Sequence, residues 1–430
     1  MASRSSSNVD HVLARATTRR RLLGRAAALG MAIPVAGAVG VASVRRAAAQ
    51  DTAGADLSGE LVFWHGLGTE ADLVTNTVLP AWQQQYPNVS IEVLQVPFDQ
   101  LQNKYNTEAS AGGGPDVLLG PLDWIGQYVE ADIVRPVDEL GGDDFRAGYT
   151  QAATDLFSRD GQLYAVPQNI NGVGLYYNRQ LVQTPPQTTD ELLAVAAEIG
   201  GQGGNSGFGV FPQFYNNAGF FHGFGGQSLT EDAQSGFASP GTIAWLTFMQ
   251  TLASSPGIFQ GQDQNAVESL FREGTLGMMI NGPWFLQNAT AGIGAENVGV
   301  AVLPQITPSE NAPARPFVGG TGVYVNSNLD DDQAQLAFEF ARWLSTDGTR
   351  PLVEQAGQIP ASTAVEPPAD DRFAQTWRDQ YEQGVAIPND PMMETVFRTA
   401  DDMLGKVFRG EAPPEQAANE AAETINRAGG

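Results

Sequence analysis

The feature that most constrains the fold is a regular alternation of short apolar runs with amphipathic segments. Residues 61–64 and 116–119 read as short buried strands, and 89–96 as a strand with Val89, Ile91 and Val93 on one face. Residues 69–86 and 98–110 are typical of helices. Proline or glycine clusters end both helical segments. Strands that alternate with helices in this way predict an α/β fold, with a parallel sheet covered on both faces.

The same alternation continues along the rest of the chain, without an internal repeat. Helix 190–199 has Thr189 or Asp190 as its predicted cap, and the glycine-rich residues 200–209 are expected to form a loop. Further strands are expected at 161–167, 173–177, 276–280, 299–303 and 322–326, and further helices at 243–252, 267–271, 283–290, 333–344 and from 371 to about 428. The chain is too long for one ordinary core, so two lobes are expected.

The first 50 residues resemble a twin-arginine export signal. Arg19, Arg20 and Arg21 precede an uncharged stretch at 26–44, and three alanines at 47–49 form a small-residue cleavage pattern. A transmembrane anchor is the alternative, but the uncharged stretch is mostly Ala and Gly, which makes it only weakly hydrophobic. We expect the twin-arginine translocase to read residues 1–50, and residues 51–58 to be a linker.

Charge and residue usage exclude several classes of protein. The net charge is −25, and since the first 50 residues hold eight arginines and one aspartate, the remainder carries 47 acidic and 15 basic side chains. Such a surface repels nucleic acid and anionic lipid. The chain has no cysteine, which excludes disulfides and a lipid-modified cysteine anchor, and only His65 and His222 remain beyond the signal. We expect no metal, no cofactor, and an exported monomer on the periplasmic or extracellular side of the membrane.

Catalytic motifs give no support for an enzyme. The glycine cluster at 200–204 lacks the Lys-Ser/Thr pair of a nucleotide loop, and there is no Gly-x-Ser-x-Gly elbow. Glycosidases need two carboxylates that flank the scissile bond. Asp116, Asp123, Asp138 and Glu139 are available, but chance pairs are unavoidable among so many acidic side chains. No catalytic residue is predicted.

Aromatic and polar side chains gather where predicted strands end. The set comprises Trp64 with His65, Asp123 with Trp124, Asn169 with Asn171, Phe214 with Tyr215, and Trp284. Ligands of open α/β sheets bind beyond the strand ends. Rings stack on the C–H faces of sugars while amides and carboxylates bind hydroxyls, so this set favours a sugar site. The run 211–224 holds six aromatic side chains, which either pack two lobes together or line a pocket.

Six blocks of sequence carry a family resemblance, from residue 59 to about 428. They are LVFWHG at 61–66, GPDV at 114–117, GQLYAVP at 161–167, LYYN at 175–178, GMMINGPW at 277–284, and RPFVGG at 315–320 with WLS at 343–345. In this order they resemble the family 1 extracellular solute-binding proteins, the receptor subunits of ABC importers.

The resemblance implies a type II periplasmic-binding-protein fold. Two α/β lobes would be joined by hinge strands and would close on a ligand in the cleft between them. The N-terminal lobe would comprise residues 59–168 with 318–345, and the C-terminal lobe residues 172–315 with 350–430. The hinge would lie near 169–174, 316–320 and 345–350.

The resemblance to the sugar-binding members also implies roles for single residues. Trp284 matches a cleft aromatic that stacks on sugar, and Asp123 matches an acid that binds hydroxyls. Asn171 and Phe397 stand where those relatives have Glu and Trp, and residues 65–68 replace an Asp-Lys pair. The full predicted site is Trp64, His65, Asp123, Trp124, Asn171, Phe214, Tyr215, Trp284, Gly320, Thr321 and Phe397.

The function implied is that of a carbohydrate receptor that delivers a sugar to a membrane permease. A glycerol phosphate or another small solute is one alternative, but a phosphate needs Arg or Lys, and Arg179 and Arg315 are only near the hinge blocks in sequence. An exported glycoside hydrolase or lyase that uses Asp123 is the other. The identity, length and linkage of the sugar do not follow from the sequence.

Overall fold

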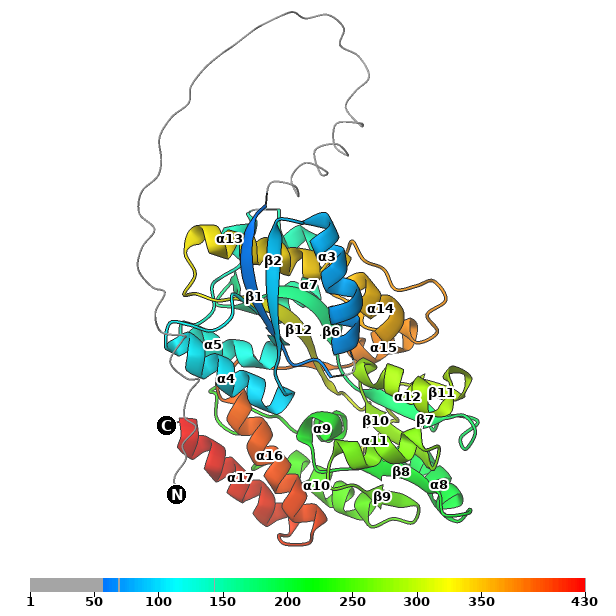
Figure 1. The fold of residues 1–430 in the computed structure, drawn as a ribbon. Helices are drawn as coiled ribbons and strands as arrows, with labels where there is room; N and C mark the ends of the chain where they lie inside the picture. The colour runs from blue at the N-terminus through cyan, green and yellow to red at the C-terminus, as the bar shows by residue number, and fades with distance from the viewer. Residues whose placement is uncertain (1–56, 69, 143, 430) are drawn as a thin grey trace, which may run out of the picture. The chain divides into compact units, whose positions relative to one another are not determined.

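The computed structural model describes residues 57–68, 70–142 and 144–429 of the chain. The predicted export signal and most of the predicted linker therefore lie outside the described residues. Within them, two β-sheets with separate sets of helices form two lobes (Figure 1). No helix in this part of the chain has the length and apolar character needed to cross a membrane.

The first lobe is built on a seven-stranded sheet with the order β13-β6-β12-β3-β1-β2, to which β14 adds beside β12. Strands β1, β2 and β3 are parallel, as predicted, but β12 runs antiparallel to both β3 and β6. The sheet is therefore mixed rather than parallel, because a strand from late in the chain is inserted into its centre. The bounds are β1 Gly59–His65, β2 Val89–Gln95, β3 Val117–Pro121, β6 Val166–Asn171, β12 Phe317–Val325, β13 Ile359–Pro360 and β14 Val385–Ala386.

Aromatic side chains attach helices to both faces of this sheet. On one face Phe340 of α13 packs 5.3 Å from the Phe63 ring. On the other face, α4 and α5 pack through Tyr105, Tyr128 and Tyr324. The helices and short strands of this lobe are α2 Ala71–Leu73, η1 Val74–Val78, α3 Leu79–Gln85, α4 Phe98–Ser110, η2 Leu122–Trp124, α5 Ile125–Glu130, α6 Asp138–Gly141, η3 Arg146–Gly148, α7 Gln151–Leu156, β4 Ser158–Arg159, β5 Gln162–Leu163, α13 Asp331–Leu344, η7 Asp347–Thr349 and α14 Arg350–Ala356.

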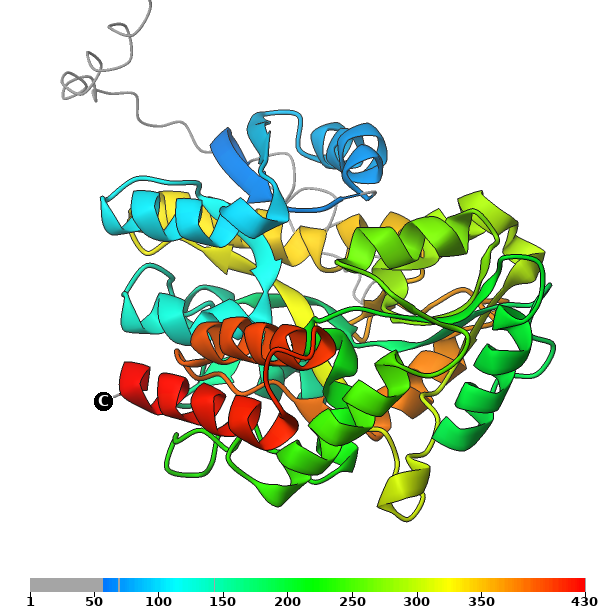
Figure 2. The ribbon, with the colours of Figure 1, turned by 90° about the horizontal axis from the view of Figure 1, so that it is seen from below.

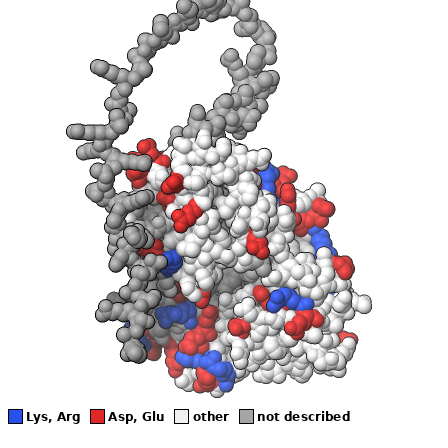
Figure 3. All heavy atoms as spheres, viewed as in Figure 1, with Lys and Arg blue, Asp and Glu red and all other residues white. Residues whose placement is uncertain are grey.

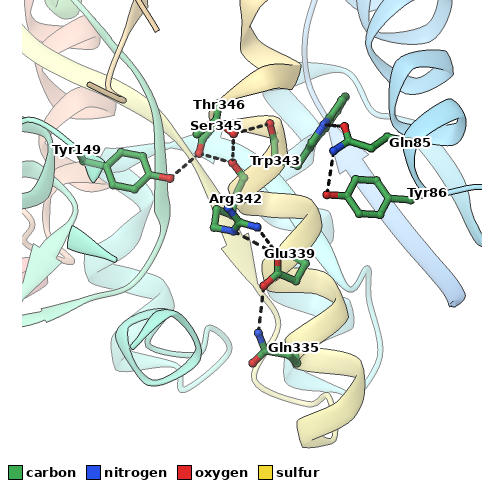
Figure 4. A network of polar contacts seen from close by, with 9 residues as sticks. All are labelled: Gln85, Tyr86, Tyr149, Gln335, Glu339, Arg342, Trp343, Ser345 and Thr346. Carbon is green, nitrogen blue, oxygen red and sulfur yellow. Dashed lines mark hydrogen bonds and ion pairs between the residues drawn. The ribbon is translucent and has the colours of Figure 1, made fainter. Parts of the chain in front are cut away.

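The end of α13 is fixed by polar contacts to two neighbouring segments (Figure 4). The indole N–H of Trp343 donates to Gln85 at 2.9 Å, which ties α13 to α3. On the other side the Tyr149 hydroxyl lies 2.7 Å from the Ser345 hydroxyl. These contacts fix the C-terminal end of α13 within the first lobe.

The second lobe is built on a five-stranded mixed sheet with the order β11-β7-β10-β8-β9. Figure 2 shows the green strands and helices of this lobe, with the red C-terminal helix beside them. Its strands are β7 Gly174–Asn178, β8 Ser206–Val210, β9 Ile258–Gln260, β10 Leu276–Asn281 and β11 Val298–Ala301. Its helices are α8 Thr189–Gly200, α9 Phe214–Gly223, α10 Pro240–Ala253, α11 Gln264–Arg272, η4 Pro283–Phe285, α12 Leu286–Ile293, η5 Ala295–Asn297, η6 Thr307–Ser309, α15 Ala374–Glu382, α16 Met393–Phe408 and α17 Pro414–Gly429.

Two local predictions in this lobe are wrong. The cap of α8 is Thr188, whose hydroxyl accepts a hydrogen bond from the Glu191 N–H at 3.2 Å. The last four residues of the glycine-rich stretch 200–209 belong to strand β8. A Cβ at Gly207 would lie 2.2 Å from the Cα of Ala196. The glycine therefore permits close approach of α8 to the sheet instead of marking a loop.

The chain passes between the two sheets at Gly172 and Val173, which join β6 to β7. A Cβ at Gly172 would lie 2.8 Å from the backbone oxygen of Phe317 and 3.0 Å from the Tyr381 ring. The start of β12 and helix α15 therefore contact this passage.

After residue 350 the chain still contributes β13 to the first sheet, although the sequence assigns this part to the C-terminal lobe.

Many of the basic side chains on the described surface form ion pairs with acidic ones. Figure 3 shows one face on which red outnumbers blue and the blue groups adjoin red. Ion pairs such as Arg146 with Asp138 at 2.6 Å and Arg342 with Glu339 at 2.6 Å follow this arrangement. The few cations are thus used to reduce local repulsion among carboxylates.

Replacement of Phe340 by Ala should lower the free energy of unfolding by roughly 3–5 kcal/mol, because the ring is fully buried and its loss leaves a cavity. Urea unfolding of the ligand-free protein measures the change. Gln335→Ala, on the exposed face of the same helix, is the control and should stay within about 0.5 kcal/mol of the parent protein. Equal effects of the two substitutions would contradict the assignment of Phe340 to the core.

Candidate functional site

Tyr215 lies at the centre of an aromatic cluster drawn from four separate parts of the chain. Its ring centroid is 6.2 Å from Trp284, 6.3 Å from Phe317 and 6.3 Å from Phe397. These rings come from α9, η4, the start of β12 and α16. Tyr215, Trp284 and Phe397 remain partly exposed, whereas Phe317 is buried. The cluster thus presents apolar ring faces at the junction of the two sheets.

Side-chain hydrogen bonds fix α9, the helix that carries Tyr215. The Phe214 N–H donates to the Asp401 carboxylate at 2.6 Å, which anchors the first turn of α9 to α16. Asn216 donates to the Ile280 carbonyl at 3.0 Å, and Asn217 donates to the Phe211 carbonyl at 2.9 Å. The amides of the aromatic run therefore hold the backbone, so that Tyr215 has a fixed position.

A chain of amide groups leads from Tyr215 into the first lobe. The Tyr215 hydroxyl donates to the Asn171 side chain at 3.4 Å, and Asn171 donates to Asn169 at 3.3 Å, both of which are long contacts. Asn169 also accepts from the Thr321 N–H at 3.0 Å. Asn171 and Thr321 are half-buried, so their polar groups remain accessible next to the rings.

Asp123 faces this cluster from η2, the turn that follows β3. Burial raises the pKa of its carboxyl to about 6, against an opposing hydrogen bond from its own backbone N–H. The charge of Asp123 adds to the rise that burial causes in the pKa of the Tyr215 and Tyr324 hydroxyls. A desolvated carboxylate near the Tyr215 ring is a strong acceptor for hydroxyl donors.

The structure brings five of the predicted residues together, namely Asp123, Asn171, Tyr215, Trp284 and Phe397, with Gly320 and Thr321 beside them on β12. Gly320 approaches the chain closely, since a Cβ there would lie 2.3 Å from the Asn169 carbonyl oxygen. Phe214 is fully buried and packs against Trp245, Phe317 and Phe397. It supports the cluster from the core.

Trp64 and His65 at the end of β1, and Trp124 in η2, are buried within the first lobe. The Trp64 ring is buried under α4, with the Lys104 ammonium 4.4 Å above it. His65 is 1 % exposed and packs against Phe63, and burial lowers the pKa of its imidazole to about 4. Trp124 is buried between the rings of Phe98 and Tyr128. The structure does not bring these three rings to the Tyr215 cluster.

Several residues near the site escaped the analysis of the sequence. Tyr381 approaches the chain passage at Gly172, and its hydroxyl is buried without a partner in the described structure. Glu70 is 5 % exposed and accepts a hydrogen bond from Gln358 at 2.8 Å, and its burial raises the pKa of the carboxyl. Asp401 also has a pKa raised to about 6 by burial. Each lies among other polar residues in the sequence, so no pattern distinguished it.

The described residues contain no cluster of three or more His, Cys, Asp and Glu side chains that could hold a metal ion. A groove of about 330 Å³ lies between α16 and α17, lined among others by Arg398, Lys406 and Glu420. None of the predicted site residues lines it, and its lysine, Lys406, pairs with Asp402 at 2.8 Å. The aromatic cluster is therefore the better candidate site.

Comparisons with known proteins agree with the fold. Residues 79–382 match the family model described as bacterial extracellular solute-binding protein. The maltotriose-binding protein of Pyrococcus abyssi is 30% identical over 72% of this chain and 68% of its own length. The galactooligosaccharide-binding protein of Bacillus subtilis is 27% identical over 85% of this chain and 88% of its own length.

Solved structures extend the comparison to three dimensions. The Thermus thermophilus maltotriose-binding protein bound with maltotriose has a TM-score of 0.78 and 25% identity, over 86% of this chain and 100% of that chain. A maltose/maltodextrin-binding domain from Bdellovibrio bacteriovorus has a TM-score of 0.79 and 22% identity, over 86% of this chain and 99% of that chain. This similarity supports the two-lobed fold. The family consists of solute-binding proteins and not of enzymes. This chain belongs to the bacterial extracellular solute-binding protein family.

Proposed function

We propose that this protein is the extracytoplasmic receptor of an ABC importer and that it binds a carbohydrate. The observation that carries the proposal is the set of partly exposed rings around Tyr215 beside the Asp123 carboxylate and the Asn171 amide. Rings that stack on sugar C–H faces and polar groups that bind hydroxyls are the two parts that a sugar site needs. Relatives named for maltotriose and galactooligosaccharide binding support the same class of ligand.

The mechanism that we propose is hinge closure without chemistry. Asp123 and Thr321 lie on the first lobe, whereas Tyr215 and Trp284 lie on the second. A ligand that contacts both sets stabilises the closed arrangement over the open one, because only the closed arrangement makes all the contacts. The hinge would use the passage at Gly172, the start of β12 and the chain after Leu344, and the permease would bind the closed form.

Export and location are part of the same proposal. Residues 1–50 would direct the folded chain to the twin-arginine translocase, and the mature monomer would act on the outer side of the cell membrane. Since the chain has no cysteine, a lipid-modified cysteine would not tether it.

A thermal-shift screen against mono- and oligosaccharides, polyols and glycerol phosphates tests the ligand class. A ligand present at about a hundred times its Kd stabilises the folded state by roughly 2.7 kcal/mol, which raises the unfolding midpoint measurably. We expect a shift with one family of sugars. A shift with phosphorylated ligands alone would overturn the carbohydrate assignment.

Trp284→Ala should weaken binding of the sugar that the screen identifies by about tenfold. Stacking adds about 0.5–1.5 kcal/mol beyond area burial, and about 1.4 kcal/mol corresponds to tenfold in Kd. Isothermal titration calorimetry measures the change. Phe224→Leu is the matched control, because this half-buried aromatic packs against Phe248 and not against Tyr215. An unchanged Kd for Trp284→Ala would remove Trp284 from the site.

Asp123→Asn should raise the thermal stability of the ligand-free protein at neutral pH. The pKa of the Asp123 carboxyl is about 6 in the folded protein and near 4 in the unfolded chain. Binding of the proton therefore stabilises the folded state fully below about pH 4, and this contribution is lost as the pH rises through about 6. The Asn variant should therefore unfold at higher temperature than the parent at pH 7.5, by an amount corresponding to at most about 3 kcal/mol, and the difference should vanish near pH 4.

The same variant tests the role of the charge in binding. In the parent protein, sugar affinity should fall as pH drops below about 6, because the protonated Asp123 is a poorer acceptor. In Asp123→Asn this part of the pH dependence should disappear, and any remainder would report Asp401, which titrates in the same range. Identical pH profiles for parent and variant would contradict the contact between Asp123 and sugar.

A further inference from the structure

Phe98 is a large apolar side chain that the fold leaves exposed. Among the described residues, Leu94 and Phe98 are the exposed large hydrophobic side chains, at 39% and 59%. Phe98 is the first residue of α4, and its ring centroid lies 5.6 Å from that of Trp124. Contact with Trp124 covers part of this ring, and the rest of its apolar surface is left in solvent.

The backbone places Phe98 at the edge of the first sheet that faces the candidate site. Strands β1 and β2 are parallel and end together at His65 and Gln95, and η2 with Asp123 follows the neighbouring strand β3. A Cβ at Gly66 would lie 3.3 Å from the Cα of Phe98, so α4 begins directly against the loop after β1. Figure 1 shows α4 at the lower end of β2, on the side of the second lobe.

Hydrogen bonds hold Phe98 at a fixed position relative to Asp123. Gln102 and Asn106 of α4 donate to the same side-chain oxygen of Gln127 on α5, at 2.9 and 3.1 Å. Helix α5 continues directly from η2, which carries Asp123 and Trp124. The exposed ring is therefore presented by a rigid pair of helices and not by a mobile loop.

Exposed polar side chains flank Phe98 in the sequence. Gln95, Asp99 and Gln100 are exposed next to it, and Asp99 lies in the first turn of α4. An exposed ring with acidic and amide neighbours has the composition of a sugar-binding surface.

We propose that Phe98 forms an outer subsite, where it stacks on a sugar unit beyond those held by Asp123 and Trp284. The ligand is then an oligosaccharide, and its affinity depends on whether it is long enough to contact Phe98 on α4. This inference rests on the proposed carbohydrate function. Phe98 would favour longer sugars over shorter ones, because shorter ligands do not reach the ring.

The test compares the parent protein with Phe98→Ala and Leu94→Ala. Maltose, maltotriose, maltotetraose and the corresponding galactooligosaccharides are titrated while tryptophan fluorescence is recorded. Phe98→Ala should lower the affinity for the longest bound ligand about two- to tenfold and leave that for the shortest unchanged. Phe98→Trp should restore the affinity, and Leu94→Ala, an exposed apolar truncation on the adjacent strand, should match the parent. The unfolding midpoint of ligand-free Phe98→Ala should also match, since the ring is exposed.

The outcomes separate this inference from the proposed function. If the parent binds the series but Phe98→Ala has the parent's affinity at every length, or loses affinity equally at every length, the outer subsite is overturned and the carbohydrate receptor stands. An equal effect of Leu94→Ala would likewise overturn the specific role of Phe98. If the parent binds no sugar of any length, the proposed function itself fails, and the subsite fails with it.

Discussion

The contact between Phe317 and Tyr215 is the interaction on which the rest of the site depends. Phe317 begins β12, the strand inserted into the centre of the first sheet, and its ring stacks on that of Tyr215 from α9 of the second lobe. The same ring meets Phe397 and His222. Because this packing lies beside the chain passage at Gly172, the aromatic site and the connection between the lobes form one structural unit.

Burial of carboxylates in an already acidic protein is the second constraint. Asp123, Asp401 and Glu70 are each desolvated, and each has a raised carboxyl pKa. Such groups reduce stability at neutral pH, and packing alone does not demand them. Asp401 anchors α9 and Glu70 fixes Gln358, so two of the three carboxylates hold backbone or amide groups. Asp123 has no such task, which makes it the carboxylate most available to a ligand.

The sequence predicted the elements better than the contacts. Short apolar runs and helical spacing located most strands and helices, because these patterns follow from local geometry. The predicted loop at 200–209 is wrong at 206–209, since Gly207 permits close packing of α8 that only the assembled lobe reveals. The antiparallel insertion of β12 was missed for the same reason: strand pairing between residues far apart in sequence leaves no local pattern.

For the site, the residue types alone indicated aromatic rings with hydroxyl-binding partners at strand ends, and the family blocks pointed to Asp123, Asn171, Tyr215 and Trp284. Sequence also determined the acidic charge and the absence of cysteine. Tertiary structure alone decided which rings are accessible. Trp64 and Tyr215 are equally plausible stacking residues in the sequence, yet the sheet turns Trp64 under α4 and leaves Tyr215 half-exposed. The physical reason is that the two faces of a strand differ only in what packs on them, and that is set by distant parts of the chain.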